Sequence, residues 1–160
     1  MAAYKKPVKK ADVRELMALV LPMIENGKNV KLTVTGYSMY PLVTSRRDAV
    51  LLAKAETLAV GDVPLFQRND GNFILHRIVK EKDGAFVTIG DYETEEEYPV
   101  YRENIVAKAV GFYRKGKFID CNSKRYKIYS RFWMKTVKIR PFLLRLLAKA
   151  AYIRGDRQSK

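Results

Sequence analysis

Apolar and polar residues alternate along much of the first 120 residues, with the two-residue period of half-buried strands. The first clear case is the segment 30–34, in which valine and leucine alternate with lysine and threonine. The same pattern predicts further strands, separated by Gly, Asp and Asn turn residues, at 49–53, 63–68, 73–80, 85–89 and 105–113. Short strands joined by short turns indicate a mainly β, partly closed fold.

Helical spacing replaces this alternation at both ends of the chain. Segment 12–24 predicts a short helix with Asp12 as its N-cap. After Cys121, the apolar residues of 129–137 and those of 142–150 would each form one helical face, with Pro141 as a break or kink between them. The chain therefore divides into an N-terminal helical segment (1–29), a β domain (30–120) and a helical tail (121–160).

The net charge of this 160-residue chain is +14, and most of it lies in the tail. Residues 121–160 contain 12 Lys and Arg but one acidic residue, whereas the preceding 120 residues have a net charge of only +3. A basic amphipathic tail fits an anionic membrane surface or nucleic acid, and its apolar stripes equally fit packing on the domain's own strands. Charge alone does not distinguish these alternatives.

The single cysteine, Cys121, allows no internal disulfide, and a single histidine excludes a zinc site built on several histidines. We expect neither a metal nor a cofactor. No segment reaches the roughly 18–20 apolar residues that cross a bilayer. The longest N-terminal run, 16–24, is too short, and we interpret it as part of a helix packed on the domain. We expect a cytoplasmic protein, with the tail as a peripheral contact to the inner membrane face.

The most informative segment is 35–41, TGYSMYP, which places Ser38 in a tight bend after a strand. Backbone N–H groups around such a bend can stabilise the oxyanion of a tetrahedral intermediate. A serine hydroxyl also needs a base within hydrogen-bond reach. The only available histidine is His76, in the apolar run FILHRIV, where a buried strand histidine without catalytic function is the competing interpretation.

Segment 36–41 resembles the nucleophile box of type I signal peptidases, which the self-cleaving domains of SOS-type repressors share in looser form. Other segments resemble further boxes of that family, in the family's order: 47–50, 60–66, 75–79, 89–91 and 106–112. Together they span about residues 34–112, half of the chain. The resemblance implies the partly closed β-fold of these peptidases and a serine endopeptidase that cleaves signal-like or leader peptides.

Histidine at the base position resembles the endoplasmic-reticulum type and some Gram-positive members, whereas most bacterial members have lysine there. For this Ser/His subtype, the resemblance implies Ser38 as nucleophile, His76 as general base and Asp91 as the residue that supports His76. The remaining residues of the box would shape the bend, the oxyanion site and the substrate groove: Gly36, Tyr37, Met39 and Pro41.

The chain departs from the family in three respects. The usual N-terminal membrane anchor is missing, and Gly36 stands where many bacterial members have a serine that donates to the oxyanion. The Gly90-Asp91 box continues with the acidic run 93–97, which we interpret as a solvated loop. If a second acidic group is needed near the base, Glu96 or Glu97 is the nearest candidate.

Two other functions fit parts of the sequence. The first is self-cleavage, as in SOS-type repressors, which carry a DNA-binding domain before a cleavable linker. Only about 30 residues precede the first strand here, too few for that arrangement. A non-enzymatic basic β module could bind nucleic acid or an anionic membrane through residues 126–153, with bases stacked on interleaved aromatics: Tyr126, Tyr129, Phe132 and Trp133. Nucleic acid is the less favoured partner, because these aromatics would align on one helical face as packing residues do.

Overall fold

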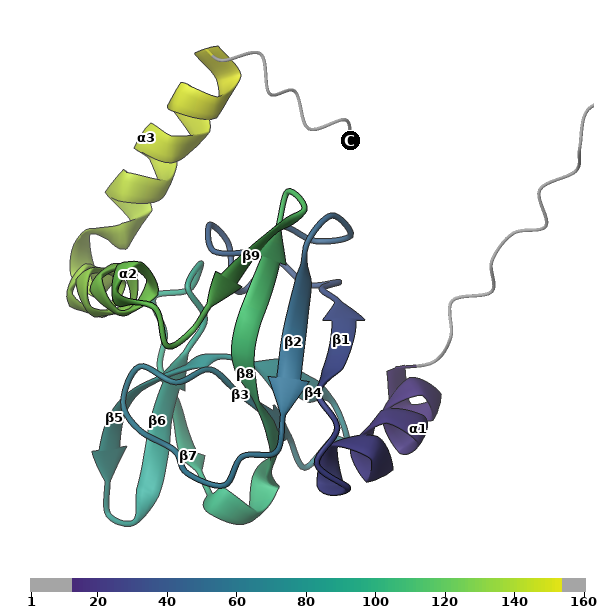
Figure 1. Cartoon of the computed structure of the whole chain (residues 1–160). Coiled ribbons are helices and arrows are strands. Elements are labelled where there is room, and N and C mark those ends of the chain that lie inside the picture. The colour runs from purple at the N-terminus through teal and green to yellow at the C-terminus, as the bar shows by residue number, and fades with distance from the viewer. Residues whose placement is uncertain (1–12, 154–160) are drawn as a thin grey trace, which may run out of the picture.

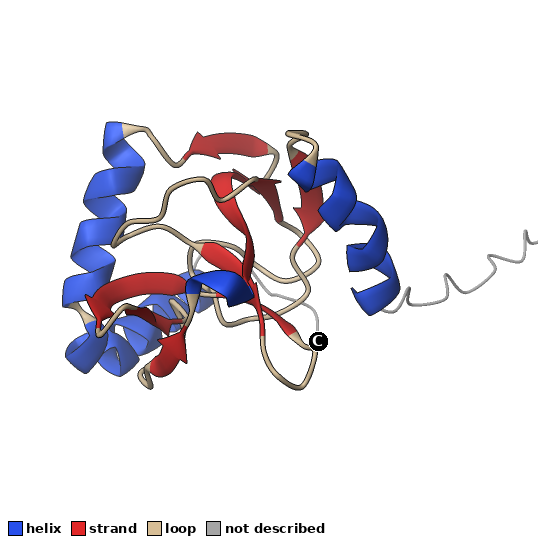
Figure 2. Ribbon diagram, turned by 90° about the horizontal axis from the view of Figure 1, so that it is seen from below, coloured by secondary structure: helices blue, strands red, loops and turns tan. Residues whose placement is uncertain are grey.

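Two antiparallel sheets form the body of the protein, with helices at both ends of the chain (Figures 1 and 2). The structure is a computed structural model that describes residues 13–153, so the expected cap Asp12 lies outside the described residues. Strands dominate residues 30–120, which confirms the prediction of a mainly β fold. Both ends of the described chain are helical, as their apolar spacing predicts.

The larger sheet curls around the core, in the strand order β1-β2-β8-β3-β4, with β9 paired to β8. Its members are β1 (Val30–Thr33), β2 (Ala49–Ala53), β3 (Pro64–Gln67), β4 (Phe73–Leu75), β8 (Ile105–Arg114) and β9 (Lys117–Asp120). The ten-residue β8 pairs with both β2 and β3, and each pairing has a register shift. Such irregularities increase local twist and bend a sheet. Because β1 and β4 stand at the two ends of the strand order, they are the edge strands of this main path in the described chain.

The smaller sheet has the order β5-β6-β7, with β5 (Arg77–Lys82), β6 (Ala85–Ile89) and β7 (Glu97–Val100). A single residue, His76, separates β4 in one sheet from β5 in the other. The prediction of one continuous strand over 73–80 is therefore wrong. The run FILHRIV is apolar on both sides of the histidine, so its pattern does not reveal where the chain changes sheets.

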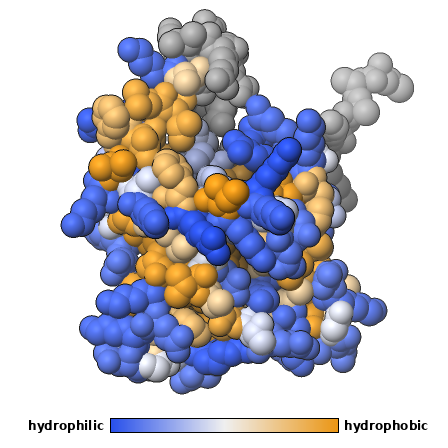
Figure 3. Space-filling model, turned by 60° about the vertical axis from the view of Figure 1, so that its left-hand side comes forward, coloured by the Kyte–Doolittle hydropathy of each residue, from blue (hydrophilic) through white to orange (hydrophobic). Residues whose placement is uncertain are grey.

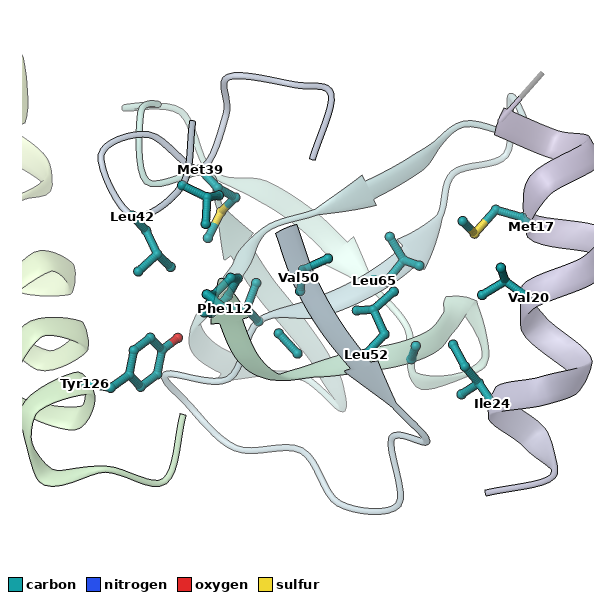
Figure 4. Close-up of a cluster of buried hydrophobic side chains, with 14 residues drawn as sticks. Met17, Val20, Ile24, Met39, Leu42, Val50, Leu52, Leu65, Phe112 and Tyr126 are labelled. Carbon is teal, nitrogen blue, oxygen red and sulfur yellow. The ribbon is translucent and has the colours of Figure 1, made fainter. Parts of the chain in front are cut away.

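The main hydrophobic core lies between the curled sheet and the first helix (Figure 4). Helix α1 (Val13–Glu25) directs Met17, Val20 and Ile24 toward the strands, and these residues are spaced as one helical face. Tyr126 enters the core from the opposite side. Within residues 13–153, no helix has the length and apolar character that crossing a membrane requires.

The tail begins with α2 (Lys124–Lys135), continues through a short 3₁₀ turn, η2 (Val137–Ile139), and ends with α3 (Arg140–Ile153). A second 3₁₀ turn, η1 (Arg102–Asn104), precedes β8. Ser123 caps α2 by accepting a hydrogen bond from the backbone of Tyr126. The buried face of α2 contains Tyr126, Ser130 and Trp133, whereas Phe132 is 56% exposed, contrary to expectation. Helix α3 projects away from the sheets (Figure 1).

Candidate active site

Ser38 is half-buried in the turn that follows β1. The turn contains a hydrogen bond from Tyr40 N to the carbonyl oxygen of Tyr37, and its base is closed by bonds between Val34 and the chain near Asp48. The Asp48 carboxylate accepts bonds from the backbone of Thr44 and Lys115. The tight bend expected around Ser38 is therefore present and is anchored to the strands.

An apolar groove of about 260 Å³ has Ser38 among its lining residues. The edge strand β1 with its extension to Gly36, and the edge strand β4, both line it. Helix α1 contributes Val13, Leu16 and Met17, and β2 and β3 also contribute residues. A groove lined by two sheet edges has the shape that an extended peptide requires.

The four residues expected around the nucleophile do not share one environment. Gly36 and Met39 line the groove, and Met39 is also part of the hydrophobic core. Tyr37 is 64% exposed, and neither Tyr37 nor the half-buried Pro41 belongs to the groove lining.

Residues 90–93, the site loop, pack directly against the nucleophile segment. The backbone N–H of Tyr92 donates a hydrogen bond of 2.7 Å to the carbonyl oxygen of Ser38. A Cβ atom at Gly90 would lie 2.7 Å from that same oxygen and 3.0 Å from Cδ of Glu93. Only glycine allows this close approach, so Gly90 lets the site loop pack against the backbone of Ser38.

His76 is 3% exposed, and both of its ring nitrogens face carboxylates. Nε2 lies 3.4 Å from Oε2 of Glu93, and Nδ1 lies 3.5 Å from Oε2 of Glu97. Burial lowers the pKa of His76 below its usual value, and the two glutamates oppose this shift only in part. The imidazole is therefore mainly neutral at pH 7, which is the form that a general base requires.

The site loop contacts both expected catalytic residues. Its Tyr92 binds the Ser38 carbonyl, and its Glu93 lies against His76. Among the residues that the structure describes, the Ser38 hydroxyl forms no hydrogen bond with His76. Catalytic hydrogen bonds are often long before substrate binds. Ser38 and His76, 38 positions apart in the sequence, therefore both contact this short loop, Ser38 through its backbone carbonyl and His76 through Glu93.

Asp91 is fully buried, but its carboxylate binds Arg77 rather than His76. Nε of Arg77 donates to Oδ1 at 2.9 Å and Nη2 donates to Oδ2 at 2.7 Å. The Tyr129 hydroxyl also donates to Oδ2, at 3.3 Å. The acidic side chains beside the imidazole are instead those of Glu93 and Glu97.

The acidic run 93–97 is therefore not simply a solvated loop, as its composition predicted. Glu97 begins β7 and also accepts two hydrogen bonds of 2.6 Å from Arg68. Glu93 is half-buried against His76, whereas Glu96 is exposed. Of the two alternative acids that the sequence offered, the structure brings Glu97 to the imidazole. Glu93 was missed because a run of acidic residues has no periodicity that would mark one member.

Residues of the tail donate hydrogen bonds to the backbone of the site loop. Arg140 is fully buried and donates hydrogen bonds to the carbonyl oxygens of Gly90 and Glu93. Nε1 of Trp133 donates to the carbonyl oxygen of Asp91 at 2.8 Å. No signal in the sequence distinguishes Arg140 from the other basic residues of the tail.

The buried Arg77 connects the same regions. Its Nη1 donates to the carbonyl oxygen of Gly61 and to the side chains of Tyr126 and Ser130 on α2. Burial alone would lower the pKa of Arg77, but the Asp91 carboxylate raises it overall, so the guanidinium stays charged. The site loop, β5 and α2 are thereby joined in one buried polar network.

No protein-family model matches the sequence, and no curated protein matches it significantly.

Proposed function

We propose that the protein is a serine endopeptidase of the signal-peptidase type, which cleaves signal-like or leader peptides with Ser38 as nucleophile and His76 as general base. One observation carries the proposal: Ser38 lines an apolar groove that two edge strands also line, and the only histidine is buried against the loop that contacts Ser38. The motif order along the chain supports the same function.

The groove suits an extended peptide substrate. In the described chain, β1 pairs only with β2 and β4 pairs only with β3, so each has a free backbone edge facing the groove region. A peptide between them would form main-chain hydrogen bonds with these edges, while its side chains contact apolar residues such as Leu32 and Leu75. The scissile carbonyl would then lie at Ser38.

The proposed reaction begins when neutral His76 accepts the proton of the Ser38 hydroxyl as its oxygen attacks the peptide carbonyl. The backbone N–H of Ser38 stabilises the oxyanion. His76 then donates its proton to the leaving amine, and water, deprotonated by His76, hydrolyses the acyl-enzyme.

Glu97 and Glu93 have different parts in this reaction. Arg68 holds the Glu97 carboxylate 3.5 Å from Nδ1, which has no hydrogen bond in the described chain. A small approach of this carboxylate when substrate binds would let Glu97 orient Nδ1 and stabilise the imidazolium. Glu93 faces Nε2, and its side chain must turn away from this nitrogen for the Ser38 hydroxyl to reach it. A carboxylate next to a histidine in this way performs the orienting function that the resemblance assigned to Asp91.

The experiment that tests the proposal is covalent labelling by a serine-directed acylating probe over about pH 5 to 9. We expect labelling of the wild type and of Ser45→Ala, a nearby serine whose hydroxyl binds only the Thr35 carbonyl. Labelling should be lost in Ser38→Ala and His76→Gln. Cleavage of leader-like peptides should be retained and lost in the same variants. Labelling that persists in Ser38→Ala, or wild type that neither labels nor cleaves at any pH, would overturn the proposal.

The nucleic-acid alternative loses part of its basis in the structure. Tyr126 and Trp133 are buried, and Tyr129 is half-buried, with its ring stacked on Trp133. Of the four aromatics proposed to stack on bases, only Phe132 presents its ring to solvent. No observation in the described chain favours this function over the peptidase.

A further inference from the structure

The outer side of the tail exposes a row of large apolar residues. Six such residues of α2, η2 and α3 are between 39% and 67% exposed: Ile128, Phe132, Ile139, Phe142, Leu146 and Leu147. Helix α3 contributes no described residue to either buried hydrophobic cluster, so its apolar side is not used for packing within the domain. Exposed apolar residues gathered in this way mark an interaction surface.

Cationic side chains surround this row. Residues 124–153 contain nine Lys and Arg and no Asp or Glu, and all of the nine except the buried Arg140 are exposed. Arg145 follows Phe142 by three positions, and Lys149 follows Leu146 by three, so each cation is next to an exposed apolar residue on the helix surface. Figure 3 shows hydrophobic and hydrophilic side chains side by side over this part of the molecule.

We propose that this tail surface, formed by the exposed residues of 124–150, docks on an anionic lipid membrane. The apolar row would enter the boundary between headgroups and acyl chains, and the eight exposed cations would contact the headgroups. The absence of any acidic residue from α2 to α3 matches the uniformly negative potential of such a membrane.

Two other partners, nucleic acid and protein, fit the tail surface less well. Four of the six exposed apolar residues are aliphatic and offer no ring for a base to stack on, which disfavours nucleic acid. A protein partner would need an acidic surface that also matches the shape of this exposed helical face, whereas a lipid surface needs no such match. A lipid surface satisfies both the apolar row and the single-sign charge.

The docked helix would stay attached to the site at its first residue. Arg140 begins α3, and its guanidinium lies fully buried against the site loop. The lipid contact therefore requires no detachment of the tail from the domain, because the residues that hold the tail are separate from those that face solvent.

The test is co-sedimentation of the full chain with vesicles of phosphatidylcholine containing about 30% phosphatidylserine, at about 0.1 M salt. We expect binding to these vesicles and at least about tenfold weaker binding to phosphatidylcholine alone. Phe142→Ser with Leu146→Ser should weaken binding by about tenfold or more. Arg145→Gln with Lys149→Gln should weaken it as well, mainly at low salt. Because these four residues are exposed, circular dichroism should show folded variants.

Leu19→Ser is the matched control, since Leu19 is a 72% exposed leucine on α1, outside the tail. It should bind vesicles as the wild type does. Ser38→Ala should also bind normally, so a failure of the peptidase proposal leaves this result unaffected. Wild type that does not bind the anionic vesicles, or a Phe142/Leu146 variant that binds as strongly as the wild type, would overturn the proposal. Binding to single-stranded DNA but not to vesicles would overturn it in favour of nucleic acid.

Discussion

Arg140 donates a hydrogen bond of 2.8 Å to the carbonyl oxygen of Gly90, fifty residues earlier in the chain. Gly90 is the residue whose missing side chain allows the site loop to approach Ser38. The same guanidinium binds the carbonyl oxygen of Glu93, whose carboxylate contacts His76. The basic tail is therefore a structural part of the candidate active site, in addition to any contact that its outer side makes.

We expect Arg140→Lys to slow labelling of Ser38 by about tenfold to a hundredfold, because an ammonium cannot reproduce the guanidinium's bonds to the site loop. The free energy of unfolding should fall by about 2–3 kcal/mol, since buried carbonyl oxygens lose their donors. Probe kinetics and urea denaturation measure the two effects. Arg145→Lys, on the exposed part of the same helix, is the control and should change neither. Wild-type labelling in Arg140→Lys would show that the tail does not position the loop.

The pH dependence of labelling should report the carboxylates around the base. Burial lowers the pKa of His76, so labelling of the wild type should rise with pH at a midpoint below the ordinary histidine value of about 6.5. Glu97 acts in the opposite direction and raises this pKa, so Glu97→Gln should move the midpoint to still lower pH. The labelling rate above the midpoint should fall, because the imidazolium loses a stabilising charge. Exposed Glu96→Gln should leave the midpoint in place, and an upward shift in Glu97→Gln would contradict this description.

Asp91→Asn should reduce stability and move that midpoint less than Glu97→Gln does. Removing one charge leaves Arg77 buried without its ionic partner, which costs about 3–5 kcal/mol. The midpoint should fall only slightly, because the Asp91 carboxylate is bound to Arg77 and its charge raises the pKa of His76 less than that of Glu97 does. Glu25→Gln breaks the exposed pair with Lys54 and should cost less than about 1 kcal/mol. A midpoint shift as large as that of Glu97→Gln would give Asp91 the orienting function instead.

Leu16→Trp should separate peptide cleavage from labelling. Leu16 lies on α1 at the groove, and a larger ring there would occupy space that a peptide needs. We expect cleavage of a leader-like peptide to fall by about tenfold through a higher KM, while a small acylating probe still labels Ser38. Leu19→Trp, on the same helix but outside the groove lining, should cleave normally. Equal loss of cleavage in both variants would place the substrate elsewhere.

The local pattern of apolar and polar residues was sufficient to predict many of the strands and helices. The predicted strands 49–53 and 85–89 match β2 and β6, because each is a short apolar run between turn residues. The helical spacing of 12–24 likewise corresponds to α1, whose buried residues form one face. The motif in 35–41 also indicated the bend that contains Ser38, since glycine and proline restrict the backbone in recognisable ways.

The surroundings of the base were decided by tertiary structure alone. Glu93 and Glu97 contact His76 at separations of 17 and 21 positions, and Arg140 binds Gly90 at a separation of 50, and no local periodicity encodes such contacts. In the tail, too, the sequence pattern does not show which side chains are buried. Its amphipathic pattern predicted helices correctly, but an apolar stripe looks the same whether it packs on a sheet or faces solvent. Trp133 is buried and Phe142 is exposed because α2 lies against the domain, whereas α3 projects away from it after Arg140 (Figure 1). The position of α2 depends on buried contacts between distant segments.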